Sequence, residues 1–440
     1  MAGGPMTLAA TGCRSLDVLW LYQLADMNPR RLTHRAALNT LQQSVAGHRV
    51  LPWNCWHRVP QYIRETDFDL IVLDHNLLAS RTAADFPARR KWLDWVSKTR
   101  AVRLAMPQDE YLWTRTLEDW FLELDIQVIF SAFGRDHAPR LYPRLVGKVA
   151  FEHCFTGYIY DEILRFGPDV VRPHAQRTLD IVYRARRLPY HLGARAQLKH
   201  AIGTAGREAA SAAGLRHDIE TGDHATVYGR EWFEFIASAR AILGTESGAG
   251  AIDERGDLAR LEQDMRARDP ALSFATFAAA MPEGWDGAPF FTIGPRHLEA
   301  AAAKTCQVLI EGTYDGVLEP DVHYVPVDER LERLPEVMER IRDPRETQPI
   351  AERAYRDIVL SGHYSYGALA ASIERAVMPL LRSGSPRISA GTARFHRARA
   401  GAQDVVGVRA PRFVYRVLAR RARPLLSALL ALRRAVRRPH

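Results

Sequence analysis

Short continuous runs of apolar residues, separated by helix-competent stretches, dominate the first part of the chain. These runs fall at residues 16–21, 48–53, 69–74, 101–105 and 127–131. Apolar runs of this length are typical of strands that are buried on both faces of a parallel sheet. Strands that alternate with helical segments predict a doubly wound α/β domain, in which ligands lie beyond the carboxyl ends of the strands.

The same alternation resumes after about residue 175, and a chain of 440 residues is long enough for two such domains. We therefore predict an α/β protein with one Rossmann-like domain at residues 1–160 and a second at 175–382. A stretch rich in Gly, Ser, Pro and Arg predicts a flexible linker at 383–408, followed by a basic amphipathic tail at 409–440.

The densest binding chemistry in the sequence follows the apolar residues 290–292. Gly294 and Pro295 come next, and proline at a first helical position is a strong start signal. Arg296 and Glu299 then occupy the first turns of the predicted helix. A helix N-terminus suits a phosphate because it carries partial positive charge and free N–H donors. A carboxylate one turn further on suits the hydroxyls of a ribose or a sugar.

The motif Arg-x-x-Glu-Ala-x-Ala at residues 296–302, followed by an apolar strand and a Gly-containing loop, resembles the donor-nucleotide segment of GT-B glycosyltransferases. The nearest likeness is to the group-1 and spore-maturation-type branch, and it covers residues 177–377. The resemblance implies two Rossmann-like domains that face a cleft, with Glu299 on the ribose or sugar and Arg296 on the diphosphate. The alternative is an ordinary βαβ crossover in which Glu299 is a solvated helix residue.

Four more residues are predicted on the donor side. The family usually has Gly where this chain has Lys304, so either the helix ends differently or Lys304 contacts the phosphates. Arg184 lies in an arginine-rich loop after a strand, which suits a diphosphate clamp or, alternatively, a solvated turn. Glu246 and Gly248 lie in a Gly-rich loop, where glycine allows close backbone approach and Glu246 would face the same cleft as Glu299.

The acceptor side is predicted at the carboxyl ends of the first-domain strands. Sugar transfer needs a group that takes the acceptor proton. We predict Asp109 as this base, because neighbouring side chains in an extended segment point to opposite faces and a short side chain is more easily fixed. The other candidates are His75, Glu110 and His137, although residues at such loops are more often helix caps or surface residues.

The net charge of +9 belongs to the end of the chain. Residues 387–440 hold fourteen arginines, no lysine and one acidic residue, a local net charge of +13 that leaves −4 for residues 1–386. A mildly acidic body argues against a nucleic-acid-binding face on the fold. Arginines around leucines at helical spacing in residues 409–440 predict a helix on an anionic membrane surface. An RNA-binding or disordered tail is the alternative.

Location and redox state follow from what the sequence lacks. The N-terminus lacks the charged region and the long apolar region that a signal peptide has. No apolar run approaches the roughly 18 residues that a membrane-spanning helix needs. The four cysteines have neither metal-ligand nor disulfide-framework spacing. We expect a cytoplasmic protein, peripheral on the inner face of the membrane.

These features together predict a metal-independent glycosyltransferase without a cofactor. It would move a sugar from a nucleotide-sugar to a glycan or lipid-linked acceptor in surface polysaccharide biosynthesis, with cationic side chains and a helix dipole neutralising the leaving group. The alternatives are a nucleotide-sugar epimerase of the same fold and a non-catalytic, membrane-docked protein that binds nucleotide-sugars.

Overall fold

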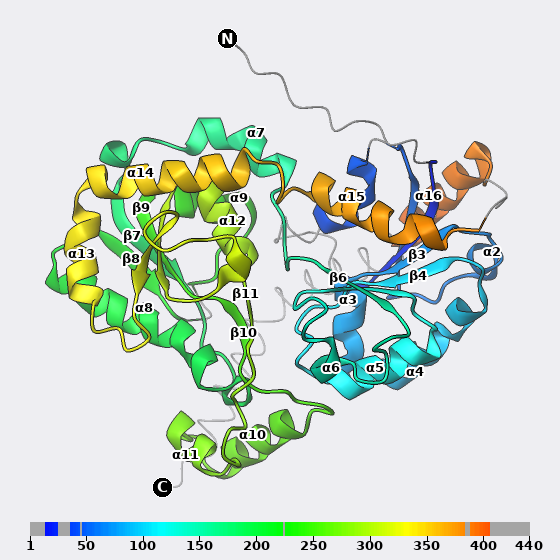
Figure 1. The fold of residues 1–440 in the computed structure, drawn as a ribbon, viewed down its shortest axis with the longest axis horizontal. Coiled ribbons are helices and arrows are strands. Elements are labelled where there is room, and N and C mark those ends of the chain that lie inside the picture. Colours follow the sequence, from blue (N-terminus) through cyan, green and yellow to red (C-terminus); the bar gives the residue numbers. More distant parts are fainter. Residues whose placement is uncertain (1–13, 25–35, 45, 223–224, 383–387, 405–440) are drawn as a thin grey trace, which may run out of the picture.

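Two parallel sheets form the two halves of the protein, as the computed structural model in Figure 1 shows. The strand order is β2-β1-β3-β4-β5-β6 in the first sheet and β13-β12-β9-β7-β8 in the second, and all of these pairs are parallel. The predicted fold class, two Rossmann-like α/β domains, is thereby confirmed. The structure describes residues 14–24, 36–44, 46–222, 225–382 and 388–404, so the tail at 409–440 lies outside the described residues.

The first sheet consists of β1 (Asp17–Tyr22), β2 (Arg49–Asn54), β3 (Leu70–Leu73), β4 (Val102–Ala105), β5 (Val128–Ser131) and β6 (Ala150–His153). The first five strands coincide with the predicted apolar runs. β6 was not predicted, because it is a partly exposed edge strand of mixed composition. The connecting helices include α3 (His75–Leu78), α4 (Phe86–Trp92), α5 (Thr114–Glu123) and α6 (Ala138–Leu141).

The second sheet consists of β7 (Leu179–Arg184), β8 (His217–Glu220), β9 (Ala239–Gly244), β12 (Cys306–Ile310) and β13 (Tyr324–Val327). Helices on its two faces include α7 (Asp161–Val170), α8 (Ala194–Ala212), α9 (Gly229–Ala237), α12 (Pro295–Ala302), α13 (Leu334–Arg342) and α14 (Pro344–Ala354). Of these, α12 is the helix predicted from Pro295.

A small hairpin of the second domain reaches the first domain. It pairs β10 (Ser247–Ala249) with β11 (Phe290–Thr292). Between these strands in the sequence come α10 (Asp257–Arg268) and α11 (Phe274–Ala279), which lie at the bottom of Figure 1. Phe290 is fully buried, with its ring 5.1 Å from that of Phe133 in the first domain. The hairpin therefore anchors β11, and with it the start of α12, at the interface of the two domains.

The chain returns to the first domain near its end. Ile159 on the way out and Ser365 on the way back form a β-bridge, so the two crossing segments lie side by side. The following helix, α15 (Tyr366–Val377), packs its apolar face into a core that it shares with β1 and β3. Its Glu374 lies 2.8 Å from Nε2 of His48.

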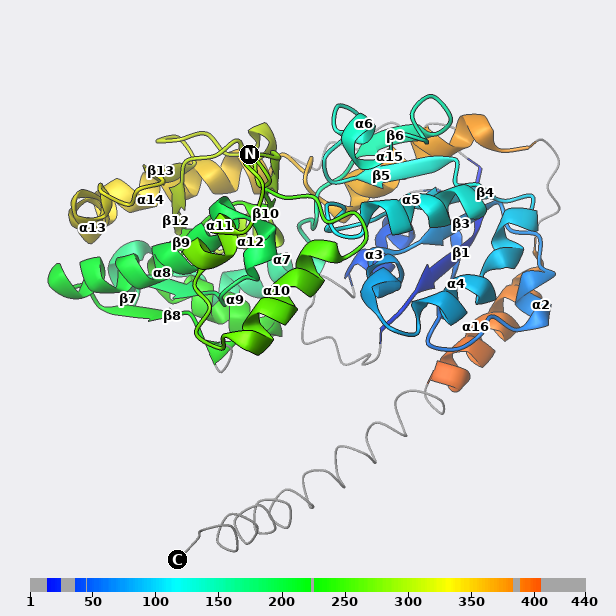
Figure 2. The ribbon, with the colours of Figure 1, turned by 90° about the horizontal axis from the view of Figure 1, so that it is seen from below.

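The predicted flexible linker is wrong over most of its length. Residues Ala390–Asp404 form α16, which packs against β2, and Figure 2 shows it next to α2 (Gln61–Arg64). The ring of His396 is buried 5.1 Å from that of Tyr62, and the amide of Ile388 donates to Asp17 at 3.0 Å. Within the described ranges, every helix falls short of the length and apolarity needed to cross a membrane.

Candidate functional site

Two adjoining pockets lie where the start of α12 meets the first domain, and Ser247 and Pro295 line both. Their volumes, about 390 and 210 Å³, together suit a small-molecule site. The larger, which we call the cationic pocket, belongs mostly to the second domain and is lined by the charged residues Arg184, Arg186, Lys199, Arg296 and Glu299. The smaller, which we call the acidic pocket, belongs mostly to the first domain and has Asp74, His75 and Asp109 as its titratable residues besides two tyrosines.

The N-terminus of α12 is held rigidly between the two pockets. The amide of Gly294 donates to Nδ1 of His297 at 3.0 Å, and the amide of Ile293 donates to Asp315 at 3.0 Å. Burial lowers the pKa of His297 to about 3, so this imidazole is neutral and adds no charge. The helix therefore presents fixed N–H donors and partial positive charge toward an anion.

Arg296 and Glu299 both contact Trp232 on α9. The indole N–H of Trp232 donates to one Glu299 oxygen at 2.8 Å, and the hydroxyl of Tyr160 donates to the other at 3.1 Å. The Arg296 guanidinium lies 5.3 Å from the ring centres of Trp232 and Tyr183. The two predicted donor residues are thus oriented by aromatic side chains that the sequence did not identify.

Arg184 is also brought to the cationic pocket, at the end of β7. It donates to the Asp218 carboxylate at 2.6 Å and lies 4.3 Å from the ring centre of Phe235. Lys199 from α8 lines the same pocket. Several cations around one helix N-terminus form a suitable environment for a diphosphate.

In the acidic pocket, Asp74 caps α3 by accepting from the amide of Asn76 at 2.8 Å, and it also accepts from the indole of Trp20 at 3.2 Å. His75 Nδ1 lies 3.4 Å from the Asp74 carboxylate. Burial acts to lower the pKa of His75, but the carboxylates of Asp74 and Asp109 outweigh it, and the pKa is raised. A histidine that keeps its proton is a poorer general base, so Asp109 remains the better candidate.

Asp109 lies in the loop after β4 with φ of 49°, a left-handed conformation that L side chains rarely adopt. The hydroxyl of Tyr111 donates to its Oδ1 at 2.8 Å. In the part of the chain that the structure describes, no other group hydrogen-bonds to this carboxylate. Its Oδ2 therefore accepts no hydrogen bond from the described residues.

Lys304 is not part of the donor side. It adopts the left-handed conformation, with φ of 48°, which favours glycine. It sits just beyond the C-terminal end of α12, away from Pro295, where its Nζ pairs with Glu352 at 2.8 Å and lies 4.4 Å from the Tyr355 ring centre. The prediction that it contacts phosphates is wrong, because the helix separates it from the pocket.

Glu246 and Gly248 are absent from the lining of both pockets. Glu246 is buried, where it accepts from the hydroxyl of Thr313 at 2.9 Å and the amide of Tyr314 at 2.8 Å. Gly248 is required by the hairpin, since a Cβ atom there would lie 1.9 Å from the carbonyl oxygen of Phe290. Both residues have structural roles, which corrects the prediction.

Glu110 and His137 are likewise outside the acidic pocket. Glu110 is fully buried and accepts from the hydroxyls of Ser131 and Tyr142, at 3.0 and 2.7 Å. Burial raises its pKa to about 7. The His137 ring packs 5.5 Å from that of Phe290 at the domain interface. Of the acceptor-side candidates, the structure brings only Asp109 and His75 together.

Comparisons with known proteins return no match among family models or curated proteins. Solved structures do match at low sequence identity, and three of them serve as examples. HepE from Anabaena with UDP-glucose has a TM-score of 0.45 and 11% identity over 83% of this chain and 100% of that one. An alpha-glucosyltransferase with UDP and a 13-mer DNA has a TM-score of 0.48 and 11% identity, over 83% of this chain and 100% of that one. AviGT4, a glycosyltransferase involved in avilamycin A biosynthesis, has a TM-score of 0.41 and 12% identity, over 82% of this chain and 97% of that one. At these values the similarities do not bear on the chemistry of this chain.

Proposed function

We propose that this chain is a GT-B glycosyltransferase that moves a sugar from a nucleotide-sugar to a hydroxyl of a glycan or lipid-linked acceptor in surface polysaccharide biosynthesis. The observation that carries the proposal is the pair of pockets that share the start of α12. One offers cations and a helix N-terminus to a diphosphate, and the other offers a carboxylate to the acceptor hydroxyl. The sugar would lie at their junction, beside Ser247 and Pro295.

Each group has a defined task in this proposal. Arg296, Arg184 and Lys199 would neutralise the charge that develops on the nucleoside diphosphate as it leaves. Glu299 would accept hydrogen bonds from ribose or sugar hydroxyls. Asp109 would take the acceptor proton through Oδ2. Among the described residues, no group of three or more His, Cys, Asp or Glu side chains is placed to hold a metal, and metal independence stays a prediction.

The test is turnover of the full chain with UDP-glucose, GDP-mannose, ADP-glucose and dTDP-glucose, each first ranked by thermal shift. Slow release of nucleoside diphosphate supports a transferase. Conversion of the sugar to its epimer without release would instead identify an epimerase. Binding without either reaction would identify a non-catalytic protein that binds nucleotide-sugars.

We also propose that residues 409–440 dock the protein on an anionic membrane. The support is their pattern of arginines and leucines, since they lie outside the described residues. The full chain should sediment with vesicles that contain phosphatidylserine and lose this binding in high salt, whereas a chain ending at Asp404 should stay in solution. Equal binding by both chains would contradict the proposal.

A further inference from the structure

A segment of the second domain lies against the loop that carries Asp109. This segment, residues 250–256, is called the strap below. Its Asp253 forms a parallel β-bridge with Leu112 of the first domain. The amide of Asp253 donates to the carbonyl of Tyr111 at 2.8 Å, and the amide of Trp113 donates to the carbonyl of Asp253. The backbones of the two domains are therefore joined directly next to the proposed base.

The loop needs such support because its conformation is strained. Asp109 and Trp113 both have positive φ, 49° and 56°. On the first-domain side, the buried guanidinium of Arg81 donates to the carbonyls of Gln108, Asp109 and Leu112, at 3.1, 2.6 and 2.9 Å. Arg81 holds the loop from within the first domain, and the strap holds it from the second.

Tyr111 links the strap to the carboxylate. Its carbonyl accepts from the strap, and its hydroxyl donates to Oδ1 of Asp109 at 2.8 Å. The Tyr111 ring is buried and lies 6.1 Å from that of Phe133, which in turn packs on Phe290 of the second domain. Displacement of the strap would therefore move Tyr111 and release the carboxylate that it orients.

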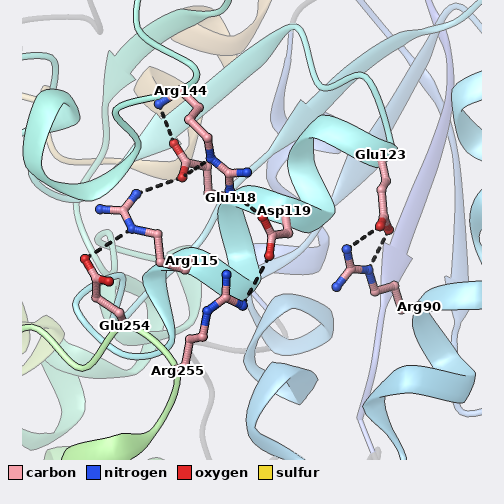
Figure 3. Close-up of polar contacts among 8 residues, drawn as sticks. All are labelled: Arg90, Arg115, Glu118, Asp119, Glu123, Arg144, Glu254 and Arg255. Carbon is pink, nitrogen blue, oxygen red and sulfur yellow. Dashed lines mark hydrogen bonds and ion pairs between the residues drawn. The ribbon is translucent and has the colours of Figure 1, made fainter.

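We propose that Tyr111 is a positioning residue for Asp109, and that the strap keeps it in place so that the base is aligned only while the two domains are docked. This inference rests on the proposed function. The ion pairs at the rim of the contact, Arg115 with Glu254 and Arg255 with Asp119 in Figure 3, are 3.2 and 3.3 Å long and partly exposed. Such pairs are worth little, so the backbone bridge and Tyr111 carry the coupling.

The first test is Tyr111→Phe, which removes only the hydroxyl. Release of nucleoside diphosphate from the four probe nucleotide-sugars should fall roughly tenfold in kcat, because a hydrogen bond to a charged group is lost, while donor Kd by calorimetry stays unchanged. The matched control is Tyr62→Phe, whose buried hydroxyl has no hydrogen-bond partner among the described residues. In an Asp109→Asn background, Tyr111→Phe should have no further effect.

The second test acts from the other domain. A Cβ atom at Gly256 would lie 2.2 Å from the Trp113 ring, so Gly256→Ala should push the strap away and lower kcat with donor Kd unchanged. Gly214→Ala is the control, because Gly214 also has positive φ but nothing lies within 4 Å of its Cβ position. In the double variant, the loss of kcat caused by Gly256→Ala should not add to the loss caused by Tyr111→Phe.

Four outcomes would overturn the inference. Wild-type kcat in Tyr111→Phe, or a loss that adds in full to that of Asp109→Asn, would show that Tyr111 does not act through the base. A Gly256→Ala protein with wild-type kcat would show that the strap does not position the loop. No release by wild-type protein from any probe would instead reject the proposed function, and the inference with it.

Discussion

The two pockets on either side of the α12 N-terminus have opposite charge. The cationic pocket has three arginines and one lysine against one glutamate, whereas the acidic pocket has two aspartates, one histidine and neither arginine nor lysine. The two cannot hold the same chemical group. On the proposed function, this difference would separate an anionic leaving group from a neutral hydroxyl acceptor across the two residues that both pockets share, Ser247 and Pro295.

The pockets also differ in how their side chains are held. In the cationic pocket, Arg296 and Glu299 are oriented by aromatic rings and by the hydroxyl of Tyr160 at the domain crossing. In the acidic pocket, Asp74 is fixed as a helix cap and Asp109 by a tyrosine of its own loop. Donor binding should therefore tolerate changes at Asp109, and turnover should not.

The largest effect is expected for Asp109→Asn. Nucleotide-sugar Kd should be unchanged, while transfer to acceptors in a native extract should fall about 10²–10⁴-fold, because the proton acceptor is lost. Asp136→Asn, an exposed change in the same domain, is the control. Full transfer by Asp109→Asn would reject this base and make His75 the next candidate.

Arg296→Ala and Glu299→Ala should act on the other pocket. Each removes charge-assisted contacts worth about 1.5–3 kcal/mol, so calorimetry should show donor affinity roughly ten- to a hundred-fold weaker with Tm little changed. Lys304→Ala, just beyond the C-terminal end of α12, provides a control, since its side chain pairs with Glu352 instead. Unchanged affinity in both pocket variants would remove α12 from the donor site.

Trp232→Phe should separate the two roles of the indole. The variant keeps a ring beside Arg296 but loses the N–H that donates to Glu299. Donor affinity should fall by about three- to tenfold, less than for Glu299→Ala, whereas Trp232→Leu should approach the glutamate variant because both contacts are lost. Equal affinity of the Phe and Leu variants would show that the ring itself contributes nothing.

The smallest effect on turnover, within about twofold, is expected for Glu110→Gln. Burial raises the pKa of Glu110 from 4.5 to about 7, so folding favours its protonated form. Its contribution to stability is therefore complete below pH 4.5 and is lost as the pH rises through about 7. Glutamine carries no charge at any pH. The Tm of the variant minus the Tm of the wild type should therefore be larger at pH 8 than at pH 4. A Tm difference that is the same at both pH values would contradict this assignment.

The sequence predicted features that depend on neighbours along the chain. The strands β1 to β5 were found because burial on both faces leaves a continuous apolar run. Arg296 and Glu299 were singled out from the motif that they form on one helix, and both line the cationic pocket. β8, a short edge strand with the sequence HDIE, has no such run and was not predicted.

Contacts between distant segments could not be predicted. Trp232 and Tyr160 reach Glu299 from another helix and from the domain crossing, and nothing near either residue in sequence marks that role. Glu246 follows a strand as an active-site residue would, but the amide of Tyr314, from a loop after another strand, occupies its carboxylate. Only the three-dimensional arrangement separates these cases.

The return of α15 and α16 has a consequence for synthesis on the ribosome. The last strand of the first sheet is complete at His153, yet the helices that cover part of this domain emerge only after the whole second domain. Until then, the nascent first domain exposes apolar surface that α15 later buries, the kind of surface on which chaperones act. A stop codon late in the reading frame would therefore damage the domain that was made first.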